Sequence, residues 1–226
     1  MSGSQLLRAI EEDDRRAVKA LLRDDPRLVE WRAGKAELHR GAIWHWIYAG
    51  DTALHLAAAG YRVKIVGLLL DAGADPNASH NHRQSGPLHY AADTCLISPA
   101  WNEKRQVETI TRLLAGGARI NAPDKNGATP LHRATRTRGM AAVKCLLKAG
   151  ADPLLKNKPG STAFHLAVQT TGRGGSGSEA AKAAQREIIK VFLGMGLSPK
   201  LKDRRGKTVG DSARSDWIRG LLSDLH

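Results

Sequence analysis

Aromatic residues and cysteines are scarce in this sequence. The chain has 226 residues but only 5 Trp, 3 Tyr, 2 Phe and 2 Cys. A core with so few rings is built mainly from Ala, Leu, Ile and Val, a composition that favours close packing of helices. Hydrophobic residues make up 42% and charged residues 25% of the chain. These fractions argue against wholesale disorder and against a membrane-embedded fold.

The sequence also lacks targeting and disulfide signals. Its first residues do not have the basic-then-apolar order of a secretion signal, and no apolar run approaches the roughly 18 residues of a membrane span. Cys95 and Cys145 lie far apart in helix-like contexts, so we expect two free thiols. These features predict a cytoplasmic protein, although a protein exported by a specialised machine would have the same composition.

One motif occurs four times, always around a histidine. In each copy a Thr or Gly is followed by Pro or Ala, then by Leu or Phe, then by His. A degenerate fifth copy spans Thr208 to Ala213. Such self-similarity is the signature of a repeat architecture. The four copies begin at Thr52, Gly86, Thr129 and Thr162 and contain His55, His89, His132 and His165.

Each copy reads physically as a helix start followed by a helix stop. A Thr before Pro or Ala is a helix N-cap with a residue suited to the first turn. A later Leu-Leu-x-x-Gly pattern, as in Leu146 to Gly150, predicts a second helix that ends at a glycine. Turn residues then lead to the next copy. Because one helix pair cannot bury its apolar face alone, the units must stack into a solenoid.

These motifs resemble the ankyrin repeat, over about residues 5 to 222. The resemblance implies an all-α repeat solenoid in a single domain, with finger loops between successive helix pairs. It also implies that the motif histidines are structural and hydrogen-bond the cap threonine and the adjoining repeat. We expect about six units: an N-terminal cap (1–29), repeat 2 (51–83), repeat 3 (84–126), repeat 4 (127–159), repeat 5 (160–205) and a C-terminal cap (206–226). An aromatic finger insertion (30–50) follows the first cap.

The spacing of the motif histidines locates insertions. Successive motif histidines are 34, 43 and 33 residues apart, and Asp211 follows His165 by 46. Against a family period of about 33 residues, two intervals are too long by about ten or more. The surplus falls between the two helices of repeat 3, near Asp93 to Gln106, and of repeat 5, in a Gly- and Ser-rich stretch near Gln169 to Glu187. We expect both insertions on one edge, opposite the fingers.

Catalytic and metal-binding signatures are weak. Gly206-Lys-Thr208 resembles the end of a phosphate-binding loop, but the first glycine of that motif would fall at Leu201. His80 and His82 on a finger have the spacing of metal ligands without an accompanying Cys or acidic cluster. Two interpretations stay open for them, a metal site and solvated loop residues. We predict no cofactor, no catalytic residues and no metal site.

The first finger concentrates aromatic residues. Trp44, Trp46 and Tyr48 alternate with other side chains, so an extended strand would place all three on one face. Either the finger folds back and packs on the first repeats, or these rings form a platform for a partner. A third hypothesis places a small-molecule or enzymatic site where this finger meets Tyr90 and Asp93.

Positive charge is confined to one half of the chain. Of 35 Lys and Arg and 22 Asp and Glu, residues 1–100 hold 12 and 12, which leaves 23 and 10 for residues 101–226. Stacked fingers would align the cations of this half into a surface that we call the basic ridge. Its finger residues are Lys125, Lys156, Lys158, Lys202, Arg204 and Arg205, and Arg133, Arg136 and Lys207 are expected to extend it toward the concave face, with Arg83 on an earlier finger.

The sequence predicts a non-catalytic module that binds an acidic protein or peptide through its fingers and concave face. In the family that the motifs resemble, these surfaces are the usual recognition surfaces. The same basic ridge would suit a nucleic-acid backbone, because electrostatics alone does not separate the two partners. We expect a monomer that does not bind a membrane.

Overall fold

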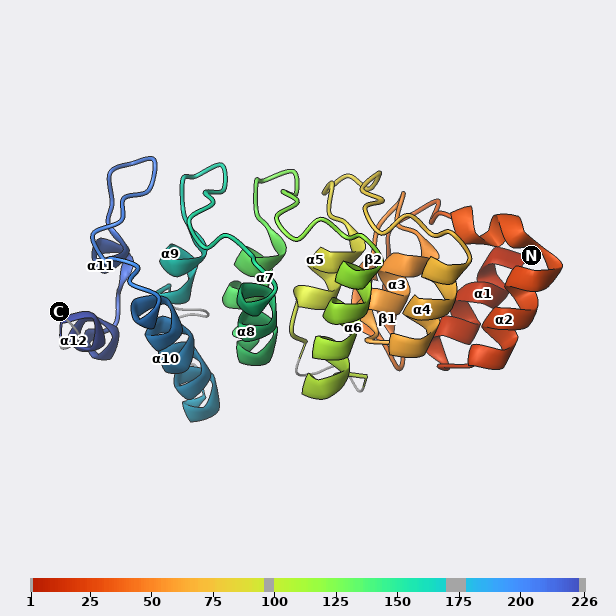
Figure 1. Cartoon of the computed structure of the whole chain (residues 1–226), viewed down its shortest axis with the longest axis horizontal. Coiled ribbons are helices and arrows are strands. Elements are labelled where there is room, and N and C mark those ends of the chain that lie inside the picture. The colour runs from red at the N-terminus through yellow and green to blue at the C-terminus, as the bar shows by residue number, and fades with distance from the viewer. Residues whose placement is uncertain (1, 96–99, 170–177, 224–226) are drawn as a thin grey trace.

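A computed structural model describes residues 2–95, 100–169 and 178–223. The helices of these residues form six pairs along an elongated stack, with the two termini at opposite ends (Figure 1). Inner helices pack on inner helices, and outer helices on outer helices, of the neighbouring pair. The inner helices are α1 (Ser2–Glu11), α3 (Ala53–Ala59), α5 (Pro87–Ala92), α7 (Pro130–Arg136), α9 (Ala163–Ala167) and α11 (Val209–Ser212). The outer helices are α2 (Arg15–Asp24), α4 (Val63–Asp71), α6 (Glu103–Ala115), α8 (Met140–Lys148), α10 (Glu179–Gly194) and α12 (Asp216–Ser223).

The arrangement confirms the all-α repeat solenoid. A helix pair is present at each end where a cap is expected, α1 with α2 and α11 with α12. The α5–α6 and α9–α10 connections are the long ones, as the spacing predicts. Residues 170–177, the Gly- and Ser-rich part of the insertion predicted near Gln169 to Glu187, lie outside the described residues.

Three of the four motif histidines, His55, His89 and His132, bond one repeat to the next. The backbone N–H of Thr52 donates to Nδ1 of His55 at 3.0 Å, so Nε2 carries the proton and donates to the carbonyl of Ser85 in the following finger, also at 3.0 Å. His132 repeats this arrangement with Thr129 and with the carbonyl of Ser161. The role that the resemblance implies is confirmed in full for His55 and His132. His89 bonds the N–H of Gly86 where the other copies have threonine, and Nε2 of His165 has no hydrogen-bond partner among the described residues.

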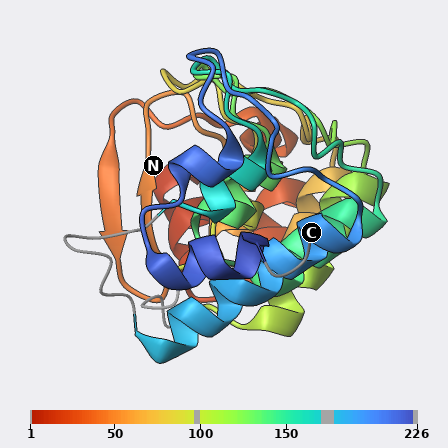
Figure 2. The same cartoon turned by 90° about the vertical axis from the view of Figure 1, so that its left-hand side faces the viewer.

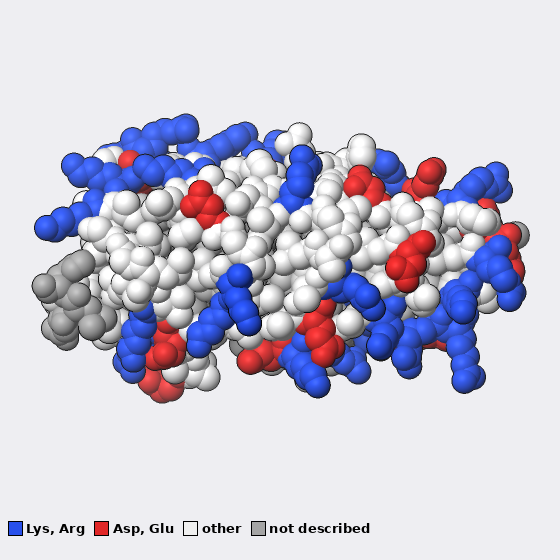
Figure 3. Space-filling view, in the orientation of Figure 1, with Lys and Arg blue, Asp and Glu red and all other residues white. Residues whose placement is uncertain are grey.

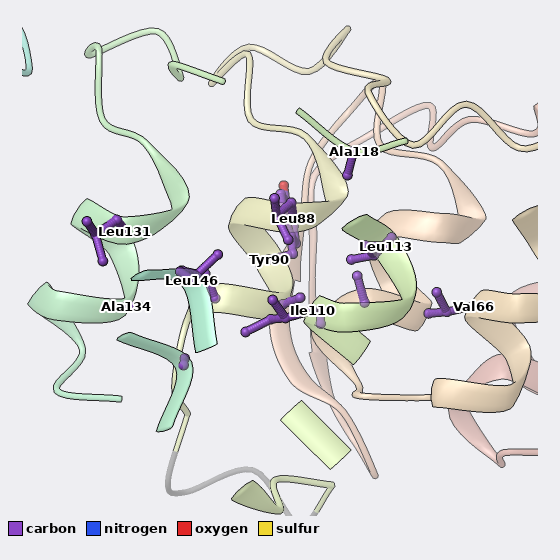
Figure 4. Packing of buried hydrophobic residues seen from close by; sticks show 14 of the residues in the cluster. Val66, Leu88, Tyr90, Ile110, Leu113, Ala118, Leu131, Ala134 and Leu146 are labelled. Atoms are coloured by element: carbon purple, nitrogen blue, oxygen red, sulfur yellow. The ribbon is translucent and has the colours of Figure 1, made fainter. Parts of the chain in front are cut away.

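A single apolar core runs the length of the stack. Its members are mostly Leu, Ile, Val and Ala, as the scarcity of rings predicts. In Figure 4, Ile110 of the outer helix α6 lies close to Leu88 and Tyr90 of the inner helix α5, and Leu146 of α8 lies toward Leu131 of α7. Each interface between neighbouring pairs contributes one section of this continuous core. The stability of a repeat therefore depends on its contacts with the adjacent repeats.

The first finger forms the one sheet of the described residues. After a short 3-10 helix, η1 (Pro26–Glu30), strand β1 (Glu37–Arg40) pairs antiparallel with β2 (Trp44–Ile47), with His39 opposite His45. Figure 2, a view along the stack, shows this hairpin beside the inner helices. The predicted alternation is present, because Ile43 and Ile47 are buried while Trp44 and Trp46 are 37% and 47% exposed. One face of β2 thus packs on the repeats, and the opposite face exposes its tryptophans to solvent.

Candidate functional site

Backbone hydrogen bonds between fingers build the surface on which the basic ridge lies. The N–H of Lys125 donates to the carbonyl of Arg83 at 2.8 Å, and the N–H of Lys158 donates to that of Asn126 at 2.9 Å. The N–H of Arg204 donates to the carbonyl of Pro159 at 3.2 Å. Seen along the stack, the finger loops superimpose (Figure 2). The fingers therefore hold their side chains at a fixed spacing.

The finger cations of the ridge and Lys207 are exposed. Lys and Arg side chains gather on the finger edge above α9 and α11 (Figure 3). In the described part of the chain, no ion pair involves any finger cation of the ridge or Lys207. The carboxylate of Asp203 lies among them, but it accepts the N–H groups of Arg205 and Lys207 at 2.8 and 2.9 Å. The ridge thus has a large excess of positive charge.

Arg133 does not extend the ridge, contrary to the prediction. Its side chain is only 5% exposed and lies 3.0 Å from Asp93 and 3.1 Å from Asp124. It also donates to the hydroxyl of Ser85 at 3.1 Å. A buried guanidinium needs such partners, since an unpaired buried charge is costly. Arg136, by contrast, is 53% exposed and remains a surface cation.

Tyr90 and Asp93 are also structural rather than accessible. The hydroxyl of Tyr90, which is 3% exposed, donates to Asp51 at 2.6 Å. Burial, and then the charge of Asp51, raises the pKa of Tyr90. Burial alone would raise the pKa of Asp93, but contacts with His45, Arg133 and Arg136 outweigh it and keep that pKa below its usual value. The side chains of Tyr90 and Asp93 therefore bind partners inside the protein rather than a ligand at the surface.

The space predicted for a small-molecule site is filled. The ring of His45 lies 4.8 Å from that of Tyr90, between centroids, and its Nε2 lies 3.9 Å from the carboxylate of Asp93. None of five hollows on the described residues has Trp44, Trp46, Tyr90 or Asp93 in its lining. The hypothesis of a pocket here therefore has no structural support.

The rings of Trp44, Trp46 and Tyr48 form what we call the aromatic face; Trp44 and Trp46 are exposed and Tyr48 is half-buried. The rings of Trp46 and Tyr48 are stacked, with centroids 6.2 Å apart. The guanidinium of Arg83 lies 5.3 Å from the centre of the Tyr48 ring and donates to its hydroxyl at 3.0 Å. Because the carbonyl of Arg83 accepts from Lys125, this arginine joins the aromatic face to the basic ridge.

The remaining candidate ligands do not assemble into a metal site. His82 packs edge-on against Tyr48, with centroids 4.8 Å apart. Over the described ranges, no group of three or more His, Cys, Asp or Glu side chains is placed to hold a metal ion. Cys95 and Cys145 are free thiols. None of the helices described is both long and apolar enough to cross a membrane.

These features define a class of protein: a helical-repeat solenoid whose fingers form a continuous edge that is positively charged toward the C-terminal repeats. Comparison with known families agrees. A model of three ankyrin repeats matches residues 96–203, and a single ankyrin repeat matches residues 49–81. The chain belongs to the ankyrin repeat family. It is a protein–protein interaction module, and the family is generally non-catalytic.

The similar curated proteins are larger. The human "Ankyrin repeat and SOCS box protein 6" is 30% identical over 158 residues, which are 66% of this chain and 35% of the relative. The human "SH3 and multiple ankyrin repeat domains protein 2" is 37% identical over 89 residues, 39% of this chain and 4% of the relative. The mouse "B-cell lymphoma 3 protein homolog" is 34% identical over 110 residues, 49% and 22% respectively. The matched stretch is thus about a third or less of each relative.

Proposed function

We propose that this protein binds an acidic segment of a partner protein along the basic ridge, with the aromatic face as the apolar end of the same surface. One observation carries the proposal: the exposed finger cations have no acidic partner among the described residues. Some exposed cations elsewhere do have an acidic partner, as Lys190 has Glu187 and Arg219 has Asp216. In this proposal the chain has no catalytic role.

The geometry supports a protein ligand that binds in one orientation, with its apolar and its acidic residues at different ends of the surface. Clustered positive charge attracts an acidic partner and speeds its encounter. Fingers that are already held by backbone hydrogen bonds lose less freedom on binding than mobile loops would. Arg83 contacts Tyr48 at one end and Lys125 at the other. We therefore expect apolar or aromatic residues of the partner near Trp46 and acidic residues toward Arg204.

Charge reversal on the ridge tests the proposal. The test captures partners from the native source with Lys156→Glu/Lys158→Glu and with the control Lys144→Glu/Lys148→Glu on α8. Both double variants change the net charge equally, and all four lysines are exposed. The ridge variant should lose about tenfold or more in affinity for the captured partner, whereas the control should stay close to the unaltered protein. Equal retention by both variants would refute a role of the ridge.

Nuclease treatment and salt titration separate a protein partner from a nucleic acid. A partner that survives nuclease treatment and binds in purified form supports the proposal. Loss of every partner after nuclease treatment, together with a steep salt dependence of RNA or DNA binding, would replace it with nucleic-acid binding.

A further inference from the structure

A second positively charged region lies on the outer helices of the N-terminal half. Lys and Arg gather there over α2 and α4 (Figure 3). A hollow of about 750 Å³ lies between α2, α4 and α6. Five cationic side chains from these three helices line it: Arg15, Arg16, Lys19, Lys64 and Arg112. Although residues 1–100 have no net charge, four of these five cations lie in that half, and Arg112 of α6 adds a fifth.

A glycine in the middle of a helix opens this hollow. Gly67 is the fifth of nine residues in α4, and the corresponding fifth residue of the nine-residue helix α8 is Lys144. A Cβ at position 67 would lie 3.3 Å from Nε and 3.4 Å from Cζ of Arg112. The guanidinium of Arg112 thus lies against the bare backbone of α4. Such a glycine costs about 1 kcal/mol relative to alanine in a helix, so its presence calls for a reason.

The acidic residues at the hollow do not neutralise it. The carboxylate of Asp14 caps α2 by accepting the N–H groups of Arg16 and Ala17, both at 3.0 Å. That of Asp13 lies between Arg62 and Arg105, 3.9 Å from each. Asp71 is the remaining acidic residue of the lining, at the C-terminal end of α4.

The lining cations, in turn, have no partner of opposite charge. In the part of the chain that the structure describes, none of the five forms an ion pair. A small ligand with clustered negative charge would meet all three helices at once.

We propose that this hollow binds a compact, multiply phosphorylated group. A phosphate ester carries about −1.5 to −2 charges and three acceptor oxygens, which match the guanidinium and ammonium donors of the lining. The volume is within the range of small-ligand sites. The group can belong to a soluble molecule or to a lipid headgroup, because the chemistry is shared. This site is separate from the basic ridge, which lies on the fingers.

Titration calorimetry with inositol hexakisphosphate tests the site without changing its charge. The protein carries Lys156→Glu/Lys158→Glu, which weakens binding of the probe at the ridge. Gly67→Leu then fills the hollow and displaces Arg112, while Thr111→Leu on α6 adds a matched side chain outside the lining. Gly67→Leu should weaken binding about tenfold or more, and Thr111→Leu should leave it unchanged. Helix propensity predicts that Gly67→Leu does not destabilise the fold, which a urea titration checks.

Vesicles with and without phosphatidylinositol bisphosphate form the second arm. If the protein is retained only on the phosphorylated vesicles, and Gly67→Leu abolishes this retention, the ligand is a lipid headgroup. If the protein binds only the soluble probe, the ligand is a free molecule. Equal binding by Gly67→Leu and Thr111→Leu would overturn the proposal, because only general surface charge would then be at work. Failure of both probes to bind the protein would overturn it too.

Discussion

Arg133 and Asp93, forty residues apart in the sequence, form a close ion pair between consecutive repeats, with Nη1 and Oδ2 3.0 Å apart. The other end of the guanidinium contacts Asp124 at 3.1 Å and Ser85 at 3.1 Å. One side chain therefore connects the end of α5, the finger before α7 and the finger before α5. Both carboxylates that it neutralises are largely buried, with side-chain exposures of 15% and 4%.

Removal of this arginine should destabilise the protein strongly. Arg133→Met keeps most of the side-chain volume but leaves two buried carboxylates without their cation, a loss of about 3–5 kcal/mol. Arg136→Met is the control, because Arg136 is half exposed and 3.9 Å from Asp93, and it should cost less than about 1 kcal/mol. Urea unfolding of both variants measures the difference. Equal losses would contradict a structural role specific to Arg133.

Acid should destabilise the fold through the motif histidines. Burial, and then the charge of Arg133, lowers the pKa of His89 from 6.5 to about 4. The unfolded chain, with a histidine pKa of about 6.5, therefore takes up the proton first as the pH falls. The stability due to neutral His89 is complete above about pH 6.5 and is lost progressively toward pH 4, by up to about 3 kcal/mol.

Urea unfolding between pH 7 and pH 4.5, on the unaltered chain and on His89→Gln, checks this expectation. The variant cannot take up that proton, so its stability should depend less on pH. Burial also lowers the pKa of His55, His132 and His165, so part of the pH dependence should persist in the variant. Identical slopes for the two proteins would argue against His89 as a source of acid sensitivity.

Alanine substitution of two glycines with similar backbone angles should separate the contribution of finger stacking to stability from that of local backbone strain. Gly160 and Gly150 both have positive φ, 86° and 95°, so alanine at either costs about 1–2 kcal/mol. A Cβ at Gly160 would lie 2.2 Å from the backbone nitrogen of Arg204, whereas one at Gly150 meets nothing within 4 Å. Gly160→Ala should therefore cost about 1–2 kcal/mol more in urea unfolding and weaken partner binding at the ridge. Similar behaviour of both variants would mean that the finger contact is not stabilising.

Local patterns predicted much of this fold. Thr129 and His132 could be assigned to a helix start from their spacing alone, because capping depends on residues three positions apart. The alternation of Trp46 and Ile47 predicted opposite faces for the same reason. The exposure of Lys156 and Lys158 likewise follows from their position on a finger and from the high cost of burying a lysine.

Features that depend on distant partners were not predictable in this way. Arg133 looks like an exposed helix residue until Asp93 and Asp124 are brought beside it. Gly67 looks like a defect in α4 until α2 and α6 supply the cations around it. In both cases the environment of the residue is made by neighbouring repeats, whose register along the stack a single motif does not specify.

Truncation of the adjacent residues Trp46 and Ile47 should affect different properties: partner binding for Trp46 and stability for Ile47. Ile47 is 1% exposed and packs beneath the hairpin, so Ile47→Ala should cost about 2–4 kcal/mol of unfolding free energy. Trp46 is 47% exposed, so Trp46→Ala should change stability by less than about 1 kcal/mol. If the aromatic face is the apolar end of the partner surface, Trp46→Ala should instead weaken the captured complex about tenfold, as loss of an interface tryptophan commonly does. Unchanged affinity in a folded Trp46→Ala protein would restrict the partner surface to the basic ridge.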